Sequence, residues 1–524
     1  MWSSYAFGLF SSTLKDELSF SQGTVDIIAS MGELGLWSSF IVGVLLERFS
    51  PRQVYVLGSG FTLVGLGYVA LATGEVVATS PASFGLMFFV ANFGTACFGQ
   101  SAQAISMRNF PAADRGKVSG IIKCVFGLSS AVLGVLYLGL LGGNDASKFL
   151  GFLSIGVPLA GLMTTIPLNV VPQKHVSYAL ERCQGVSASM LPFYSWFSMV
   201  ATALTVAIVM EAVGISLPTP WSGIALILIV GSSMLLPLQY GRVFFRSRAG
   251  GVSISSGGLC NIDGEVGLLE ETHGDFELGE EGQGEQAYLL APSMEEAQDD
   301  ETDSCRNNKD LTWRQCLRDL RFWVLFLAFM CGTGAGLVVI NNIASLAESL
   351  GLESSTFLVT MLGLANAFGR LSVGWFSDRV VGMGLPRSLV LCATLLCTCV
   401  VSFLLAAGFA DLLYVLCVAS GICYGAMFAL VLALTGDLFG VTHIGTNYGL
   451  LDLGPAAGSF FFATGVVNIF YRQEGDGSDC TGPSCFRGTF FCTGSSCLLA
   501  CVLVYTAVTG PGMRTRHMRV SRDV

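Results

Sequence analysis

The chain has 524 residues, of which 52% are hydrophobic and only 12% are charged. Soluble globular proteins carry roughly 25% charged residues, so this composition and the mean hydropathy of +0.65 exclude an ordinary soluble domain. The net charge of −10 belongs to one segment, because residues 249–305 hold 15 acidic residues and no Lys or Arg, which leaves +5 on the rest.

Long apolar runs follow one another along the chain. About 20 apolar residues cross the ~30 Å hydrocarbon core as a helix, and these runs are too long for the strands of a membrane barrel. Six runs come first, at 1–14, 25–46, 54–73, 84–107, 118–141 and 149–171. Two follow, at 193–213 and 221–239. After a polar loop come six more, at 322–346, 357–376, 388–409, 412–436, 445–470 and 490–509.

This six-two-six order predicts an all-α membrane protein with about 14 transmembrane helices. The expected parts are a first half (1–171), a linker helix pair (172–240), an acidic loop (241–321), a second half (322–510) and a basic tail (511–524). The loop has too few apolar residues to form a core, so we expect disorder there, with a short amphipathic helix at 311–321. The first run gives only ~21 Å of helix, and we expect it to be truncated.

Lys and Arg residues indicate the orientation. With both termini in the cytoplasm, 21 of the 27 lie on the cytoplasmic side, and two, Lys123 and Arg370, fall inside helices. The remaining four fall in external loops: Lys15, Lys148, Arg472 and Arg487. Because basic loops stay on the cytoplasmic side, we expect both termini and the 241–320 loop to be cytoplasmic.

The two six-helix halves share an internal repeat. One frame aligns Gly116-x3-Gly120-x2-Lys123 with Gly445-x3-Gly449-x2-Asp452, and a second aligns Gly43-x3-Glu47 with Gly374-x3-Asp378. Arg108 and Asp437 also match, eight residues before the first Gly of the first frame. Such a duplication predicts a binding site between two halves related by an axis along the membrane normal.

Several motifs resemble a known family. Gly369-Arg-Leu-Ser-Val-Gly-Trp-Phe-Ser-Asp-Arg379 resembles the signature loop after helix 8 of the major facilitator superfamily. The opening Tyr5–Lys15, Arg108-Asn-Phe-Pro111 and Cys480-x4-Cys485-Phe486 resemble its nodulin-like branch, which is related to oxalate/formate antiporters and monocarboxylate carriers. The resemblance implies two six-helix halves that alternate access to a midplane site for a small-molecule substrate, with two linker helices between them.

Charged residues inside predicted membrane helices need a reason, because each costs at least ~2.5 kcal/mol to insert. Lys123, Asp452 and Glu33 are such residues. Small residues share a helix face with Lys123, so its side chain should face protein or a cavity. We expect Lys123 to bind substrate and the two carboxylates to couple protons, and we predict that Lys123 and Asp452 act as a pair across the two halves. The alternative is structural ion pairs between helices.

Polar residues in helices that line the cavity of this fold are further candidates for substrate contact, with hydrogen bonding between helices as the alternative. They are Gln100, Gln103, Asn341, Asn342 and Tyr424.

Charged residues near the cytoplasmic helix ends are expected to gate or brace the halves. For Arg370 the alternative is a side chain that reaches from a helix end to the membrane surface. The set comprises Arg370, Asp378, Arg379, Glu47, Arg108 and Asp437.

Cys480 and Cys485 are expected to form a disulfide in an external or lumenal loop, since four intervening residues can close it and that compartment is oxidising. Two free thiols, or pairing with Cys492 or Cys497, are the alternatives.

We expect a secondary transporter of a small metabolite, an organic anion such as a monocarboxylate, with protons as a possible coupling ion. Oxalate-type relatives place cations in helices 8 and 11, but helix 11 here carries Asp452. This departure argues against a dicarboxylate and leaves a monocarboxylate, a zwitterion or a neutral metabolite open. The rival is a membrane sensor or scaffold that keeps the fold without transport.

Other classes of function lack support. The four His residues are scattered, and no Cys or His cluster has metal spacing, so we expect neither an enzyme nor a bound cofactor or metal. No basic patch with interleaved aromatic residues indicates nucleic-acid binding. We expect a monomer in the lipid bilayer, and the sequence is compatible with the plasma membrane and with vacuolar or endosomal membranes.

Overall fold

The fold is described from a computed structural model of the chain. The described residues are 18–110, 112–127, 146–165, 310–349, 355–474 and 483–509. Several predicted segments lie outside them: the runs at 1–14, 193–213 and 221–239, the acidic loop up to residue 309, and the tail at 511–524.

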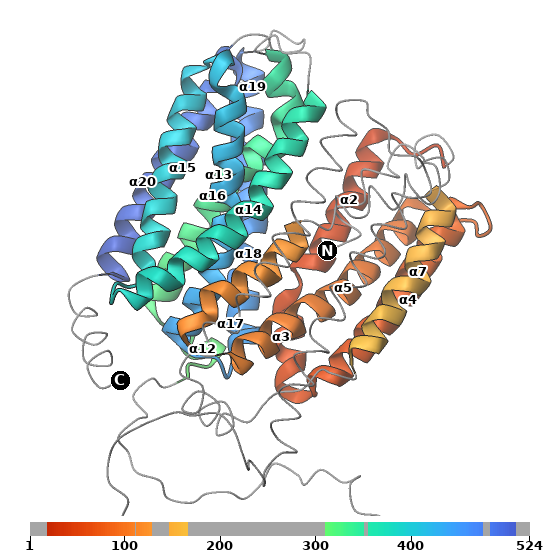
Figure 1. The fold of residues 1–524 in the computed structure, drawn as a ribbon. Helices are drawn as coiled ribbons and strands as arrows, with labels where there is room; N and C mark the ends of the chain where they lie inside the picture. Colours follow the sequence, from red (N-terminus) through yellow and green to blue (C-terminus); the bar gives the residue numbers. More distant parts are fainter. Residues whose placement is uncertain are drawn as a thin grey trace, which may run out of the picture. The chain divides into compact units, whose positions relative to one another are not determined.

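The described part of the first half is helical (Figure 1). Its elements are α2 (Gln22–Trp37), α3 (Ser39–Arg48), α4 (Pro51–Thr73), α5 (Pro81–Asn109), a 3₁₀ turn (Ala112–Asp114), a helix over residues 115–127, and α7 (Ala146–Thr164). Both α4 and α5 start at a Ser-Pro step, where the Ser side chain caps the first turn and Pro has no N–H to leave unpaired.

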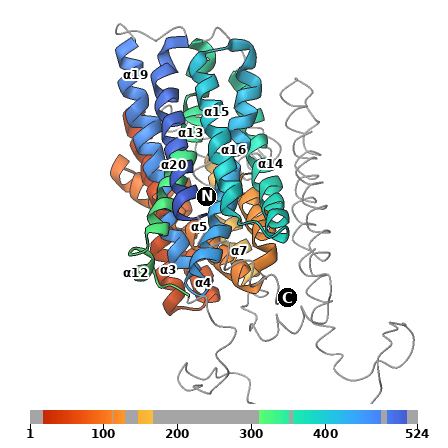
Figure 2. The same cartoon turned by 90° about the vertical axis from the view of Figure 1, so that its left-hand side faces the viewer.

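The second half is also helical, and Figure 2 shows α15, α16 and α20 side by side. Its elements are α12 (Trp313–Cys316), α13 (Leu320–Ser349), α14 (Ser355–Gly382), a 3₁₀ turn (Ala410–Leu412), α15 (Ser388–Ala407), α16 (Leu413–Phe439), α17 (Ile444–Leu451), α18 (Leu453–Gly458), a π-helix (Ser459–Val466), α19 (Val467–Glu474), a 3₁₀ turn (Pro483–Phe486) and α20 (Arg487–Ala507).

Nine helices within the described residues are long and apolar enough to cross a membrane. The predicted total of about 14 stays a prediction, because three of the predicted runs lie outside that part and the run at 118–141 is described only as far as residue 127. The amphipathic helix predicted at 311–321 is shorter than expected, since only Trp313–Cys316 is helical. The Asp319 carboxylate accepts the Arg321 N–H at 2.9 Å, which starts α13 as a separate helix.

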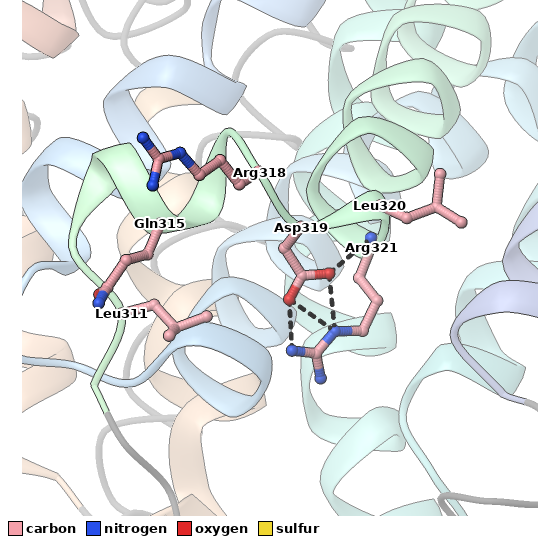
Figure 3. Close-up of a pocket in the computed structure, with 6 residues that line it drawn as sticks. All are labelled: Leu311, Gln315, Arg318, Asp319, Leu320 and Arg321. Atoms are coloured by element: carbon pink, nitrogen blue, oxygen red, sulfur yellow. Dashed lines mark hydrogen bonds and ion pairs between the residues drawn. The ribbon is translucent and has the colours of Figure 1, made fainter.

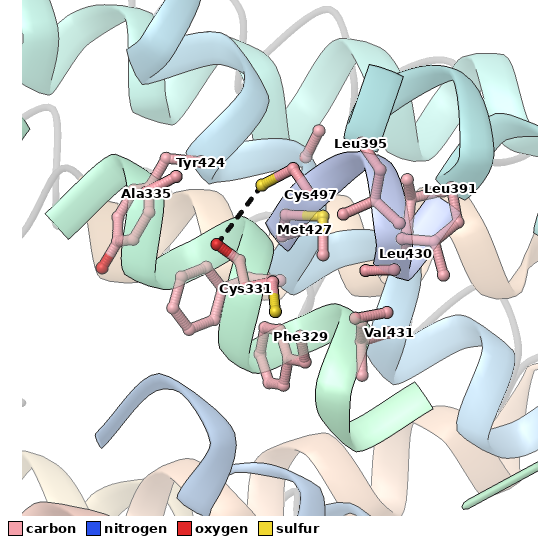
Figure 4. Close-up of a cluster of buried hydrophobic side chains, with 14 of the residues drawn as sticks. Phe329, Cys331, Ala335, Leu391, Leu395, Tyr424, Met427, Leu430, Val431 and Cys497 are labelled. Atoms are coloured by element: carbon pink, nitrogen blue, oxygen red, sulfur yellow. Dashed lines mark hydrogen bonds between the residues drawn. The ribbon is translucent and has the colours of Figure 1, made fainter. Parts of the chain in front are cut away.

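The second half packs around a dense apolar core (Figure 4). Phe329 on α13, Leu395 on α15 and Met427 on α16 are buried together there. The Cys497 thiol of α20 contacts the Cys331 carbonyl of α13 at 3.5 Å, which joins a fourth helix to the cluster. This core supports α16 and α13, the helices that carry several candidate residues.

Close helix approaches join the two halves at the repeated glycines. A side chain at Gly374 on α14 would collide with the backbone of Gly116 and Gly120. Likewise, a side chain at Gly43 on α3 would meet the backbone of Gly445 at 2.6 Å or less. The repeat therefore corresponds to two matching contacts, one between α14 and the 115–127 helix and one between α3 and α17.

Candidate functional site

Lys123 lies in the 115–127 helix with only 1% of its surface exposed. Its Nζ forms no hydrogen bond with any residue in the described part of the chain. Three aromatic rings surround it instead, with centroids 4.5 Å away for Tyr448, 5.6 Å for Phe126 and 5.8 Å for Phe428. Ring faces attract a cation but do not replace hydrogen bonds, so the ammonium retains its capacity to bind an anion.

Arg370, which was predicted to gate or brace the halves, lies beside Lys123. It is 2% exposed, and its Nη1 donates to the Lys123 carbonyl at 2.6 Å while its Nε donates to Asn366 Oδ1 at 2.9 Å. The guanidinium carbon lies 4.7 Å from the Phe428 ring centroid. Arg370 is eight residues before Asp378, or ~12 Å deeper along the helix, so it does not reach the membrane surface.

Asp452 is the third buried charge, with 1% of its surface exposed. It lies at the break between α17 and α18. Its Oδ2 accepts a hydrogen bond from Ser39 Oγ at 3.1 Å, and its Oδ1 has no partner. Its charge acts on Lys123, yet no ion pair within 4.0 Å joins the two. The predicted direct pairing is therefore absent from this conformation.

The polar residues of α5 border the same region. Gln100 is buried and donates its amide to the Gly445 carbonyl at 2.5 Å, and Gln103 is also buried. Neither side-chain carbonyl oxygen accepts a hydrogen bond from a described residue. Buried polar atoms without partners are uncommon in native proteins and call for an explanation, such as a bound molecule.

The other predicted contact residues lie elsewhere or are satisfied locally. Glu33 on α2 is exposed, and no described contact links it to Lys123 or Asp452. Asn341 is also exposed. The Asn342 amide donates to the Val338 carbonyl at 2.9 Å, at a kink where the Asn342 backbone leaves helical geometry.

Tyr424 is buried on α16, with its ring edge-to-face against Phe428 at 5.1 Å. It therefore supports the aromatic ring that lies beside both Lys123 and Arg370.

A network of paired charges joins the helix ends that are predicted to face the cytoplasm. Asp378 accepts the backbone N–H groups of Gly116 and Lys117 at 2.8 and 2.7 Å and pairs with Arg387 at 2.6 Å. Asp437 pairs with Arg387 and Arg115, each at 2.9 Å. Burial alone would lower the pKa of the Arg387 guanidinium, but Asp437 and Asp378 raise it above its ordinary value. We call these residues the brace.

The contact between α3 and α17 corresponds to the brace in the internal repeat, and its polar side chains are more exposed than those of the brace. Glu47 accepts from Thr446 Oγ1 at 2.8 Å and contacts His443 Nδ1 at 3.1 Å. Arg108 donates to the carbonyls of Val441 and Thr442.

Arg379 belongs to neither junction. Its side chain is exposed, with the guanidinium 5.0 Å from the Trp375 ring centroid.

Comparisons with known proteins agree with this architecture. A Nodulin-like family model matches residues 2–239, and a model of the NFD4 C-terminal domain matches residues 309–517. The chain belongs to the nodulin-like branch of the major facilitator superfamily. The Protein NUCLEAR FUSION DEFECTIVE 4 of Arabidopsis thaliana is 23% identical over 519 residues, 95% of this chain and 84% of the relative.

Two further similarities concern transporters. The oxalate:formate antiporter of Oxalobacter formigenes is 27% identical over 157 residues, 29% of this chain and 37% of that protein. The proton:xylose symporter XylE, solved with 6-bromo-6-deoxy-D-glucose, has a TM-score of 0.56 at 11% identity, covering 97% of this chain and 92% of that one. The latter supports the fold alone. This nodulin-like chain is therefore a multi-pass membrane protein.

Sequence reasoning missed several residues of this nodulin-like site: Ser39, Phe126, Asn366, Phe428 and Tyr448. Phenylalanine and serine are common in membrane helices, so only the distance from Lys123 or Asp452 within the repeat could have drawn attention to them.

The structure describes Cys485, which takes part in a disulfide bond. The expected partner Cys480 lies outside the described residues, so that pairing stays a prediction. Within the described part, no group of three His, Cys, Asp or Glu side chains could hold a metal ion.

A surface cavity of about 490 Å³ lies at the junction of α12 and α13 (Figure 3). Asp319 and Arg321 pair within it, and Arg318 and Leu320 also line it. None of the predicted site residues lines this cavity, so it is separate from the site around Lys123.

Proposed function

We propose that this chain is a secondary transporter that carries a small organic anion, a monocarboxylate, by alternating access with proton coupling. The observation that supports this is a pair of buried cations that form no ion pair with a described residue. Among the described residues, neither Lys123 nor Arg370 lies within 4.0 Å of a carboxylate oxygen. A buried charge without a partner is costly, so an anionic substrate would stabilise this site.

Charge arithmetic favours one negative charge on the substrate. With Asp452 ionised, Lys123 and Arg370 contribute +2 and Asp452 contributes −1, which leaves +1 for the substrate to neutralise in that state. A dicarboxylate would leave an excess negative charge in a low-dielectric site. The rings of Tyr448, Phe126 and Phe428 would contact the apolar part of such a substrate.

Uptake into proteoliposomes tests the proposal. Labelled acetate, lactate and pyruvate are compared with oxalate and glucose, with and without an inward proton gradient. We expect gradient-stimulated uptake of one or more monocarboxylates, loss of uptake in Lys123→Met, and partial uptake with altered preference in Lys123→Arg. A sensor or scaffold of the same fold would carry none of these compounds, and uptake unaffected by Lys123→Met would contradict the proposed site.

A further inference from the structure

Two contacts between the halves occupy equivalent positions in the internal repeat. Ser39 and Arg370 each lie four residues before the first Gly of the matching frames, while Asp452 and Lys123 match in the other frame. In the structure Ser39 Oγ donates to Asp452 Oδ2 at 3.1 Å, and Arg370 Nη1 donates to the Lys123 carbonyl at 2.6 Å. The same junction therefore occurs twice, once with two cations and once with a carboxylate and a hydroxyl.

The Ser39 hydroxyl has two acceptors but only one proton to donate. Asp452 Oδ2 lies 3.1 Å away in the other half, and the Leu36 carbonyl lies 3.2 Å away in its own half. A hydrogen bond to an ionised carboxylate is roughly twice as strong as a neutral one. The hydroxyl therefore favours Asp452 when that carboxylate is ionised and has an alternative acceptor when it is not.

Both partners lie at helix breaks. Between α2 and α3, the Ser38 hydroxyl donates to the Leu34 carbonyl at 2.7 Å, a bond that tends to bend helices. Asp452 lies between α17 and α18, three residues before Pro455, which has no N–H to continue the hydrogen-bond pattern. Lys123 and Arg370, by contrast, lie within continuous helical segments. Small backbone rotations are therefore easier at the Ser39–Asp452 contact than at the Lys123–Arg370 contact.

We propose that Ser39 is a positioning residue that couples protonation of Asp452 to the contact between the two halves. With Asp452 ionised, the Ser39 hydroxyl donates to it and ties α3 to the break after α17. When Asp452 takes a proton from water on the open side, its bond to Ser39 weakens and the hydroxyl turns to the Leu36 carbonyl. The halves then separate more readily here, and the proton leaves to water on the opposite side.

Among the described residues, few charged or titratable groups lie around Asp452. Tyr448 lies on the preceding turn, and its hydroxyl interacts with the Asp452 carboxylate. Lys123 lies against the face of the Tyr448 ring. The charge of Arg370 also acts on Tyr448. The α13 atoms near Gly454, two residues beyond Asp452, belong to Met330, Phe326 and Phe329, which carry no charge.

Ser119 provides a matched control for Ser39. Its hydroxyl is also buried, and it also has one acceptor in its own half and one in the other, the Gly116 carbonyl at 3.0 Å and the Ala429 carbonyl at 2.8 Å. Neither acceptor can take up a proton. Ser119→Ala therefore removes a bond between the halves without changing a titratable junction.

Infrared difference spectroscopy on the purified full-length protein, titrated from neutral to acid pH without substrate, tests the proposal. We expect a carboxylic acid C=O band that appears on acidification and is missing in Asp452→Asn. Ser39→Ala should move its midpoint up by about half to one pH unit, because the ionised form loses one hydrogen bond. Ser39→Thr should restore the wild-type midpoint, and Ser119→Ala should leave it unchanged.

Two results would overturn the role of Ser39: a band that persists in Asp452→Asn, or equal midpoints in Ser39→Ala and the wild type. The inference rests on the proposed function in one respect: the proposed function supplies the identity of the anion that is transported with the proton. Since the spectra need no substrate, absence of monocarboxylate uptake would refute the proposed function while the titration still decides on Ser39. With uptake present, Asp452→Asn should exchange anions without responding to a proton gradient.

Discussion

The brace and the central site both bury charges, but they treat them in opposite ways. In the brace, Asp378 and Arg387 meet hydrogen-bond partners of opposite charge at 2.6 Å. In the site around Lys123, Arg370 and Asp452, which we call the central site, neither Lys123 Nζ nor Asp452 Oδ1 forms a hydrogen bond with a described residue. Fully paired buried charges hold a structure together, whereas unpaired ones are costly and persist where a ligand completes them. On this difference rests our proposal that Lys123 binds substrate whereas Asp378 braces the two halves.

The largest effect on stability is expected for Asp378→Ala. This change leaves the N–H groups of Gly116 and Lys117 without their acceptor and removes one of the two carboxylates that pair with Arg387. Breaking a buried pair costs roughly 3–5 kcal/mol. We expect a strong fall in folded yield and in the thermal unfolding temperature of the detergent-purified protein.

Asp319→Ala is the matched control for this prediction. Its ion pair with Arg321 spans only two residues and lies partly exposed, and the change also removes the acceptor of the Arg321 N–H at the start of α13. The loss should therefore be about 1–2 kcal/mol. Equal destabilisation by the two variants would show that the brace is no stronger than a surface ion pair.

The next largest effect concerns transport rather than stability. Lys123→Met removes a buried ammonium that has no hydrogen-bond partner, so the unfolding temperature should stay the same or rise. Monocarboxylate uptake should fall at least ~30-fold, since a direct charge contact contributes about 2 kcal/mol or more.

Lys117→Met, six residues earlier in the same helix, should behave in the opposite way. Its Nζ pairs with Asp114 at 2.5 Å, so its removal should lower the unfolding temperature. A lower unfolding temperature in Lys123→Met than in Lys117→Met would refute the distinction between paired and unpaired lysines.

A smaller effect is expected for Arg370→Lys. Lysine keeps the charge but cannot donate to both Asn366 and the Lys123 carbonyl from one planar group. We expect about a tenfold higher half-saturating concentration for the monocarboxylate, equivalent to ~1.4 kcal/mol, with maximal uptake largely retained. Unchanged concentration dependence would indicate that Arg370 takes no part in anion binding.

The sequence predicted features that depend only on the order of residues along the chain. Apolar run length identified membrane helices, and the Gly-x3-Gly-x2 frames marked Lys123 and Asp452, which are both buried. It was less informative where the outcome depends on which helix lies opposite. Arg370 was grouped with Asp378 because the two are close in sequence, although eight helical residues separate them by ~12 Å.

Site residues of common types could not be predicted from the sequence. Tyr448, Phe428 and Ser39 matter only because three helices bring them to Lys123 and Asp452. Glu33 is the converse case, since an acid in an apolar run attracted attention but its side chain is exposed. The positions of charged residues along one helix do not show which neighbouring helix packs against them.

The smallest effect is expected at the repeat counterpart of Asp378. Glu47 holds the matching place in the first half, but its side chain is 29% exposed and its charged neighbour, His443, is 28% exposed. Glu47→Gln keeps an acceptor for the Thr446 hydroxyl and loses only a solvent-screened charge, so stability should change by less than about 1 kcal/mol. Asp378→Asn, at the buried counterpart, should lose considerably more, because an amide cannot match the carboxylate that receives two backbone N–H groups and Arg387. Thermal unfolding of both variants in the same detergent measures the difference directly. Equal losses would mean that position in the repeat, rather than burial, determines how strongly each junction holds the halves.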